Sequence, residues 1–151
     1  MALRNIVKEG DPVLRKVSRE VTDVNDRIRA LIDDLTETMR NAEGVGLAAP
    51  QVGVLRRVVV VEVDGQLFEL VNPKVVETEG EQYEEEACLS VPGESGMVRR
   101  PARVKVEALD RDGNKVSYEG TELLARAFCH EIDHLDGILY IDKAEEVFDN
   151  D

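Results

Sequence analysis

Two histidines four residues apart, His130 and His134, restrict the possible folds of this chain more than any other part of the sequence. They are the only histidines among 151 residues, and Glu131 lies between them, so the segment reads His-Glu-x-x-His. Successive residues of an α-helix are about 100° apart, so side chains at i and i+4 share one face. Both imidazoles can then bind one metal ion, which predicts a helix with a metal site on its inner face.

The helix is predicted to run from about residue 121 to 136 and to end before Gly137. Its apolar side chains fall within an arc of about 180°: Leu123, Leu124, Ala127, Phe128, Ile132 and Leu135. Glu131 and His134 lie inside this arc and His130 lies at its edge, so a carboxylate and an imidazole face the core. The other side is predicted to be solvated: Glu122, Arg126, Cys129, Asp133 and Asp136.

A buried polar group without a partner costs at least ~1–3 kcal/mol, so the inward carboxylate and imidazole need compensation. A divalent ion with its water compensates both. The alternative is a buried helix whose histidines form hydrogen bonds within the core. The paired spacing with an intervening glutamate favours the metal.

A catalytic metal site needs a third protein ligand and an open position. With no further histidine, this ligand is a carboxylate or one of the two cysteines, Cys88 and Cys129. Cys129 adjoins His130 and points about 100° away from it. Cys88 lies in a short extended stretch that ends at Pro92-Gly93, beside an acidic run, 79–86, that is typical of a solvated strand edge. The residues alone leave the choice open.

The remaining elements predict an α+β fold. A helix over residues 26–43 is indicated by five apolar positions on one face: Ile28, Leu31, Ile32, Leu35 and Met39. Asn25 is its expected N-cap, and Gly44 is expected in a left-handed turn after its end. A short helical turn is expected over 11–15. Strands are predicted at 57–63, 66–71, 74–79, 102–109 and 115–119. We expect mainly antiparallel sheets packed around the C-terminal helix, with an N-terminal helix.

Composition excludes several classes of partner. Asp and Glu number 32 against 19 Lys and Arg, and the net charge of −13 repels polyphosphate and anionic membranes. The longest apolar runs, 58–61 and 138–141, fall far short of the ~20 residues of a membrane helix. No apolar block of signal-peptide length opens the chain, so a cytoplasmic protein with reduced cysteines and a single domain, 1–151, is expected.

Three segments resemble the signature motifs of the peptide deformylases. They are Gly-Val-Gly-Leu-Ala-Ala-Pro-Gln at 44–51, Glu-Ala-Cys-Leu-Ser at 86–90 and His-Glu-Ile-Asp-His-Leu-Asp-Gly at 130–137. Their order and separations are similar to those of the family over essentially the whole chain. Two positions depart from the usual pattern: Ala87 replaces a glycine, and Cys129 replaces a frequent glutamine. Neither departure removes a ligand, the base or an oxyanion donor.

The resemblance implies a hydrolase that removes the N-formyl group from the N-terminal formylmethionine of new proteins and releases formate. It implies a metal held by Cys88, His130 and His134, with Fe2+ native and Zn2+, Ni2+ or Co2+ as substitutes. Glu131 would act as general base and acid, and the Gln51 amide and Leu89 N–H would stabilise the oxyanion. Val45 and Gly46 would contact the substrate, with Leu124 of the second helix lining the methionine pocket.

Two alternatives use the same helix: a zinc endopeptidase, and a non-enzymatic domain with a structural metal. A basic cluster, 99–103, is expected to pair with Glu86 or its neighbours rather than with nucleic acid. Some deformylases carry a C-terminal extension that docks on the ribosome. The acidic segment 143–151 does not resemble a basic extension, so we expect no stable docking by that route, although nascent chains remain the substrate.

Overall fold

The computed structural model describes residues 2–150, so both limits of the expected domain, 1 and 151, lie outside it. The elements follow one another as η1 (Pro12–Arg15), α1 (Asp26–Asn41), β1 (Gly46–Ala48), η2 (Ala49–Val52), β2 (Val58–Val63), β3 (Gln66–Glu79), β4 (Gln82–Cys88), β5 (Val91–Arg100), β6 (Arg103–Leu109), β7 (Lys115–Thr121), α2 (Glu122–Leu135), η3 (Tyr140–Asp142) and β8 (Glu146–Asp149). The predicted α+β class is confirmed.

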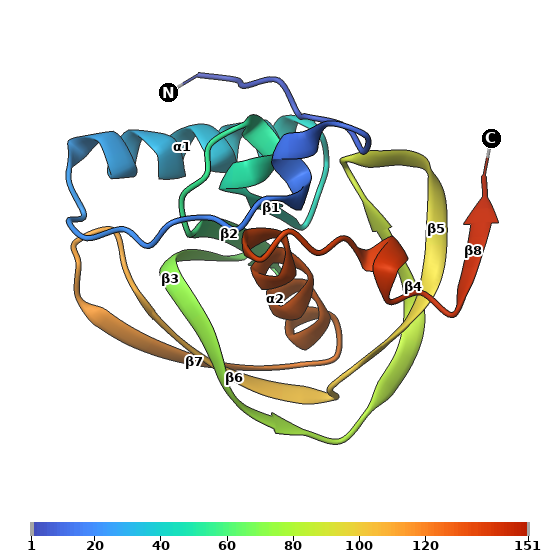
Figure 1. The fold of residues 1–151 in the computed structure, drawn as a ribbon. Helices are drawn as coiled ribbons and strands as arrows, with labels where there is room; N and C mark the ends of the chain where they lie inside the picture. The colour runs from blue at the N-terminus through green and yellow to red at the C-terminus, as the bar shows by residue number, and fades with distance from the viewer. Residues whose placement is uncertain (1, 151) are drawn as a thin grey trace.

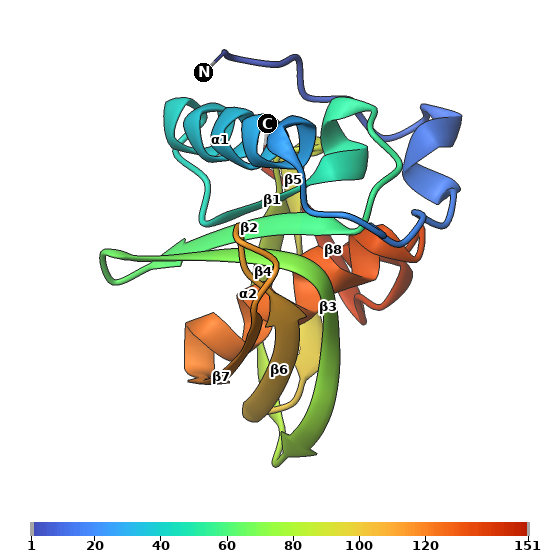
Figure 2. The same ribbon diagram turned by 90° about the vertical axis from the view of Figure 1, so that its left-hand side faces the viewer.

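Two antiparallel sheets surround the C-terminal helix. Strands β1, β2, β3, β6 and β7 form the larger sheet in that order, and β4, β5 and β8 form the smaller one. Helix α2 lies between the sheets, and α1 lies on the opposite side of the larger sheet (Figures 1 and 2). The prediction of a central C-terminal helix inside mainly antiparallel sheets is therefore confirmed.

The valine run 58–61 forms most of β2 and is buried on both faces of the larger sheet. Val59 and Val61 pack in the same cluster as Phe128 of α2. The other two valines pack with Leu35 on the α1 side. Side chains alternate across a strand, so a strand covered by a helix on each face needs an unbroken apolar run.

Helix α1 begins and ends close to its predicted limits. Asn25 is the N-cap, and its side chain accepts a hydrogen bond from the Ile28 N–H at 3.1 Å. The predicted left-handed turn at Gly44 is wrong, because Glu43 adopts that conformation with φ of 59°. Gly44 is needed for a different reason: a Cβ there would lie 2.8 Å from Leu89 Cδ1. The absence of a Cβ at Gly44 thus allows the loop between α1 and β1 to contact the turn between β4 and β5.

The predicted break between strands at Asn72-Pro73 is also wrong. Strand β3 runs through it, with a register shift relative to β6 and φ of 52° at Asn72. The Asn72 amide accepts from the Val21 N–H at 2.9 Å and donates to the Val21 carbonyl at 2.8 Å. These two hydrogen bonds stabilise the left-handed conformation of Asn72, so the strand continues where the sequence pattern predicts a turn.

The β4–β5 hairpin was not predicted. The acidic run 79–86 contributes much of β4, and β5 passes through Pro92-Gly93, where the extended stretch was expected to end. A register shift between Glu86 and Cys88 accommodates the extra residues of β5, whose other edge pairs with β8. Glu86 is buried whereas its neighbours Glu84 and Glu85 are exposed, so the acidic composition of this strand did not indicate that Glu86 is buried. Among residues 2–150, neither α-helix has the length and apolar composition needed to cross a bilayer.

Gly137 ends helix α2 with φ of 75°, and a Cβ there would lie 2.5 Å from the Arg15 carbonyl oxygen. We predict that Gly137→Ala lowers the free energy of unfolding in urea by about 1–3 kcal/mol more than Gly53→Ala. Gly53 is the control because its φ is 81° while no atom lies within 4 Å of its added Cβ. Gly53→Ala should cost only the conformational strain of about 1 kcal/mol. Equal losses in the two variants would contradict this account of Gly137.

Candidate metal centre

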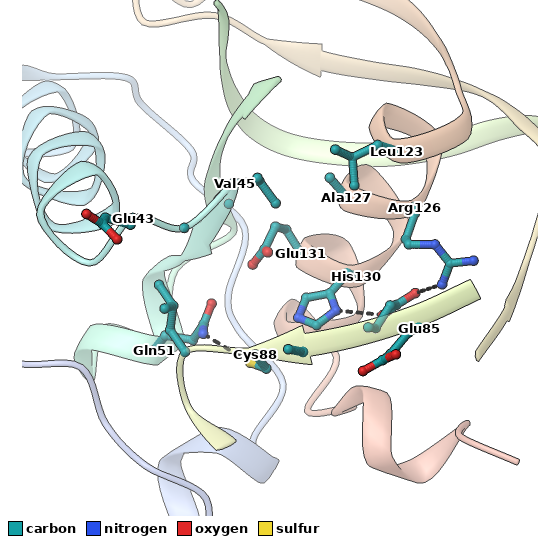
Figure 3. A pocket seen from close by; sticks show the side chains of 15 residues that line it. Glu43, Val45, Gln51, Glu85, Cys88, Leu123, Arg126, Ala127, His130 and Glu131 are labelled. Carbon is teal, nitrogen blue, oxygen red and sulfur yellow. Dashed lines mark hydrogen bonds and ion pairs between the residues drawn. The ribbon is translucent and has the colours of Figure 1, made fainter. Parts of the chain in front are cut away.

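A cavity of about 350 Å³ opens between the loop before β1, the end of β4 and one face of α2. Figure 3 shows Gln51 and Cys88 on one side of it, and Leu123, Ala127 and Glu131 projecting from α2 on the other. The cavity therefore joins the three segments that carry the sequence motifs.

Cys88, His130 and His134 converge beside this cavity. Each offers a ligand atom, and these atoms all lie within 4.8 Å of one another. The Cys88 Sγ is 3.4 Å from His134 Nε2, and the two imidazole centroids are 5.2 Å apart. The histidines come from successive turns of α2, as predicted, whereas the sulfur arrives from the end of β4. The structure thus places at one point the three residues expected as ligands.

This cluster fits a divalent metal ion. One thiolate and two imidazoles are the ligand types that zinc and iron(II) accept. Within residues 2–150, the buried carboxylate atom Glu131 Oε1 has no hydrogen-bond partner. Such orphaned polar atoms are costly in a core, and they are expected where a bound ion and its water complete the environment.

Glu131 is buried and lies against the backbone of β1. A Cβ on Gly46 would lie 2.6 Å from the Glu131 Oε2, so only glycine leaves room for the carboxylate at this position. Burial raises the pKa of Glu131 to about 7, with His130 opposing the shift and Glu86 adding to it. Such a carboxyl group can both accept and release a proton near neutral pH.

A second buried carboxylate, Glu86, organises the side of α2 that faces the hairpin. It accepts two hydrogen bonds from the Arg100 guanidinium, at 2.9 and 3.0 Å, and pairs with Arg126. Burial alone would raise the pKa of Glu86, but hydrogen bonds from His130 and Arg100 lower it to about 2. Glu86 is therefore an ionised acceptor inside the protein.

Glu86 also orients one of the candidate ligands. Its Oε1 lies 2.8 Å from His130 Nδ1, and an ionised carboxylate can only accept, so Nδ1 carries the hydrogen. That leaves Nε2 of His130 as the atom with a free lone pair. A carboxylate that accepts from the second ring nitrogen is the usual support of a metal-binding histidine.

The predicted solvated side of α2 is wrong at Arg126, which is only 5% exposed. Its guanidinium donates to the Val98 carbonyl of β5 and pairs with Glu86. Asp133 also accepts from Arg100 at 2.6 Å, and Lys143 lies 3.0 Å from the same carboxylate. The small sheet covers this face of the helix, so polarity there reflects ion pairing rather than exposure to solvent. The predicted pairing of the 99–103 cluster with Glu86 is confirmed by Arg100.

The other expected site residues lie around the same cavity. Val45, Gly46, Gln51 and Leu89 all line it. The Gln51 side chain points toward Cys88, with Nε2 3.5 Å from Sγ (Figure 3). The expectation for Leu124 is wrong: it packs against the core between α2 and the larger sheet, and Leu123 lines the cavity instead.

Sequence reasoning missed three residues that support the site: Arg100, Arg126 and Ser90. The sequence shows Arg100 only as part of a basic cluster, and helical periodicity places Arg126 on the solvated side of the helix. Ser90 was part of a motif without a role, although its side chain is fully buried and accepts a hydrogen bond from Gln51. An arginine on a helix that also presents acidic residues is ambiguous in sequence, because the same pattern describes a solvated face and a buried ion pair.

The chain is similar in sequence and in fold to known proteins. The sequence profile of the family described as Polypeptide deformylase matches residues 3–149. A peptide deformylase of Acetivibrio thermocellus is 60% identical over 151 residues, which cover 100% of this chain and 89% of that protein. The crystal structure of a peptide deformylase from Legionella pneumophila matches with a TM-score of 0.93 and 42% identity, over 95% of this chain and 87% of that one. The crystal structure of peptide deformylase from Thermotoga maritima also gives 0.93, at 38% identity over 96% and 99%.

The Glu86 network predicts a large effect of one substitution. Glu86→Gln leaves Arg100 and Arg126 buried without a full counter-charge, which should lower the free energy of unfolding by about 3–5 kcal/mol. It should also weaken metal affinity roughly 10- to 100-fold, because His130 loses its carboxylate partner. Urea unfolding and metal titration measure the two effects. The control, Glu62→Gln, breaks a pair with Arg40 whose arginine is exposed, and should cost about 0–1 kcal/mol. A cost for Glu86→Gln as small as that of the control would contradict the prediction.

Proposed function

The chain belongs to the peptide deformylase family of hydrolases, and we propose that it removes the N-formyl group from the N-terminal formylmethionine of newly made proteins and releases formate. The observation that carries the proposal is the convergence of Cys88, His130 and His134 beside a buried Glu131 in an open cavity. We assign this reaction to a single catalytic domain comprising residues 1–151.

The family is metal-dependent, and Cys88, His130 and His134 would hold the ion here. When bound, a divalent ion would polarise the formyl oxygen and lower the pKa of water toward neutrality. Fe2+ is proposed as the native ion, with Zn2+, Ni2+ or Co2+ as substitutes, since two imidazoles and a thiolate suit all of them.

Proton transfer is assigned to Glu131. Its carboxylate lies beside the ligand cluster and the cavity, where it can take the proton of the attacking water and deliver it to the leaving amine. Burial keeps bulk water from competing for this proton. The carbonyl oxygen of the formyl group gains negative charge during attack and needs donors aimed at it. We assign these to the Gln51 side-chain amide and the Leu89 N–H, which line the same cavity.

The methionine side chain is proposed to enter the apolar part of the cavity, formed by Val45, Leu123 and Ala127. Val45 and Leu123 are 44% and 48% exposed, so a substrate would cover apolar surface that is otherwise in water. Gly46 presents its backbone beside Glu131, and an extended peptide can pair with it as an added strand.

The expected partners are N-formylmethionyl nascent chains in the cytoplasm. Direct binding to nucleic acid or membrane is not part of the proposal, because the net charge is −13.

The activity is tested by formate release from formyl-Met-Ala-Ser after anaerobic purification and loading with each metal. We predict that Glu131→Gln keeps the metal content of the unmodified protein and lowers kcat roughly 10²–10⁴-fold, because only proton transfer is lost. Elemental analysis and the formate assay are the measurements. Loss of metal in Glu131→Gln would instead make Glu131 a ligand of a structural site. Fragments from casein without formate from the peptide would indicate an endopeptidase and overturn the proposal.

The ligand assignment predicts different outcomes for the two cysteines. Cys88→Ala should abolish stoichiometric metal binding and formate release together, because a ligand is removed. Cys129→Ala makes the same chemical change one residue from His130, outside the ligand cluster, and should keep its metal. Elemental analysis after extensive dialysis distinguishes the two. Metal retention in Cys88→Ala would remove the sulfur from the site.

A further inference from the structure

We propose that Ser90 is a positioning residue that orients the side-chain amide of Gln51 toward the metal centre. The inference rests on the proposed function, in which Gln51 donates a hydrogen bond to the developing oxyanion. Ser90 lies in the turn between β4 and β5, two residues after Cys88, and its side chain is fully buried.

The orientation of the Gln51 amide starts from its oxygen. The Ala48 N–H lies 2.9 Å from Gln51 Oε1, and a backbone N–H can only donate, so this atom of the amide must be the oxygen. The nitrogen therefore faces the other way, toward the β4–β5 turn. Gln51 is 1% exposed, so water cannot supply partners in place of these contacts.

Ser90 takes one of the two hydrogens on this nitrogen. Gln51 Nε2 donates to Ser90 Oγ at 3.1 Å and lies 3.5 Å from Cys88 Sγ. The two hydrogens of an amide are about 120° apart in one plane. Fixing one hydrogen on Ser90 leaves the second directed to the side of Cys88, which is the side of the candidate metal and of the cavity.

The backbones of Gln51 and Ser90 are held in the same relative position by one segment of the N-terminus. The Val7 N–H donates to the Gln51 carbonyl at 2.7 Å, and the Glu9 N–H donates to the Ser90 carbonyl at 2.7 Å. Residues 7–9 thus bridge the two loops from outside the cavity. With both backbones fixed, the remaining freedom of the Gln51 amide is its rotation, which the Ala48 N–H restrains at the oxygen and the Ser90 hydroxyl restrains at the nitrogen.

Removing the hydroxyl should therefore affect the transition state more than substrate binding. Without Ser90 Oγ, the Gln51 amide is restrained only by the Ala48 N–H at its oxygen and by the longer contact with Cys88 Sγ. Its hydrogens can then turn out of line with the oxyanion, while the methionine pocket is unchanged. Misdirection of a single donor should lower kcat roughly 10- to 100-fold and leave KM within about twofold.

The test compares Ser90→Ala with two further serine variants in the reconstituted enzyme, using formyl-Met-Ala-Ser. Ser90→Thr keeps the hydroxyl and should retain kcat within about threefold of the unmodified enzyme. Ser95→Ala is the matched control: Ser95 is 2% exposed on the same hairpin and contacts Glu85 and Asn150 rather than Gln51. It should retain kcat within about twofold. Metal content is measured in every sample.

A double-mutant cycle with Gln51→Ala tests whether Ser90 affects kcat through Gln51. Gln51→Ala should lower kcat roughly 10²–10³-fold, and adding Ser90→Ala should cause no further loss, because the group being positioned is absent. Independent losses in the double variant, an unchanged kcat in Ser90→Ala, or equal losses in Ser90→Ala and Ser90→Thr would each overturn the inference.

A measurement independent of turnover separates this inference from the proposed function. In 15N-labelled protein, the Gln51 side-chain amide protons should exchange slowly with solvent and should exchange faster in Ser90→Ala but not in Ser95→Ala. Unchanged exchange in Ser90→Ala would overturn the positioning role even in an active enzyme. Absence of formate release from the unmodified holoenzyme would overturn the proposed function, while the exchange experiment would still decide whether Ser90 orients Gln51.

Discussion

The buried carboxylate of Glu86 connects the small sheet to the central helix α2. It lies on β4 and is paired with Arg100 of β5 and with Arg126 and His130 of α2, so one ionised group joins the small sheet to the central helix. An isolated charge at this depth would strongly destabilise the fold, and the hydrogen bonds and ion pairs from these three side chains compensate for the burial of the carboxylate. Because Cys88 follows Glu86 on the same strand, this network also determines where the sulfur lies relative to the two imidazoles.

Close approach of backbone and side chain shapes the other wall of the cavity. Gly44 leaves room for Leu89, and Gly46 leaves room for the Glu131 carboxylate. Larger residues at these positions would push β1 away from the β4–β5 turn and from α2. The segment that contains Gly44 and Gly46 can therefore lie close to both Leu89 and the Glu131 carboxylate only because neither glycine carries a Cβ.

Local patterns predicted the helices well, and the reasons are local. Asn25 caps α1 through a side-chain bond to its own first turn, and the His130–His134 spacing places both rings on one face of α2. The β4–β5 hairpin was missed because an acidic strand and a Pro-Gly pair are typical of exposed segments. Arg126 was misplaced for a related reason: helical periodicity gives the direction of a side chain but does not show what covers it.

The sequence by itself determined the helical pair of imidazoles, the glutamate between them and the α+β class, because these follow from the spacing of side chains along one chain. Its residues alone left the third ligand open between a cysteine and a carboxylate, and only resemblance to a family favoured Cys88. Tertiary structure brought the Cys88 sulfur within 3.4 Å of His134 across 46 residues of sequence. It also decided that Glu86, rather than water, would receive the His130 hydrogen. Such contacts depend on how a hairpin packs on a helix, and no local pattern encodes that packing.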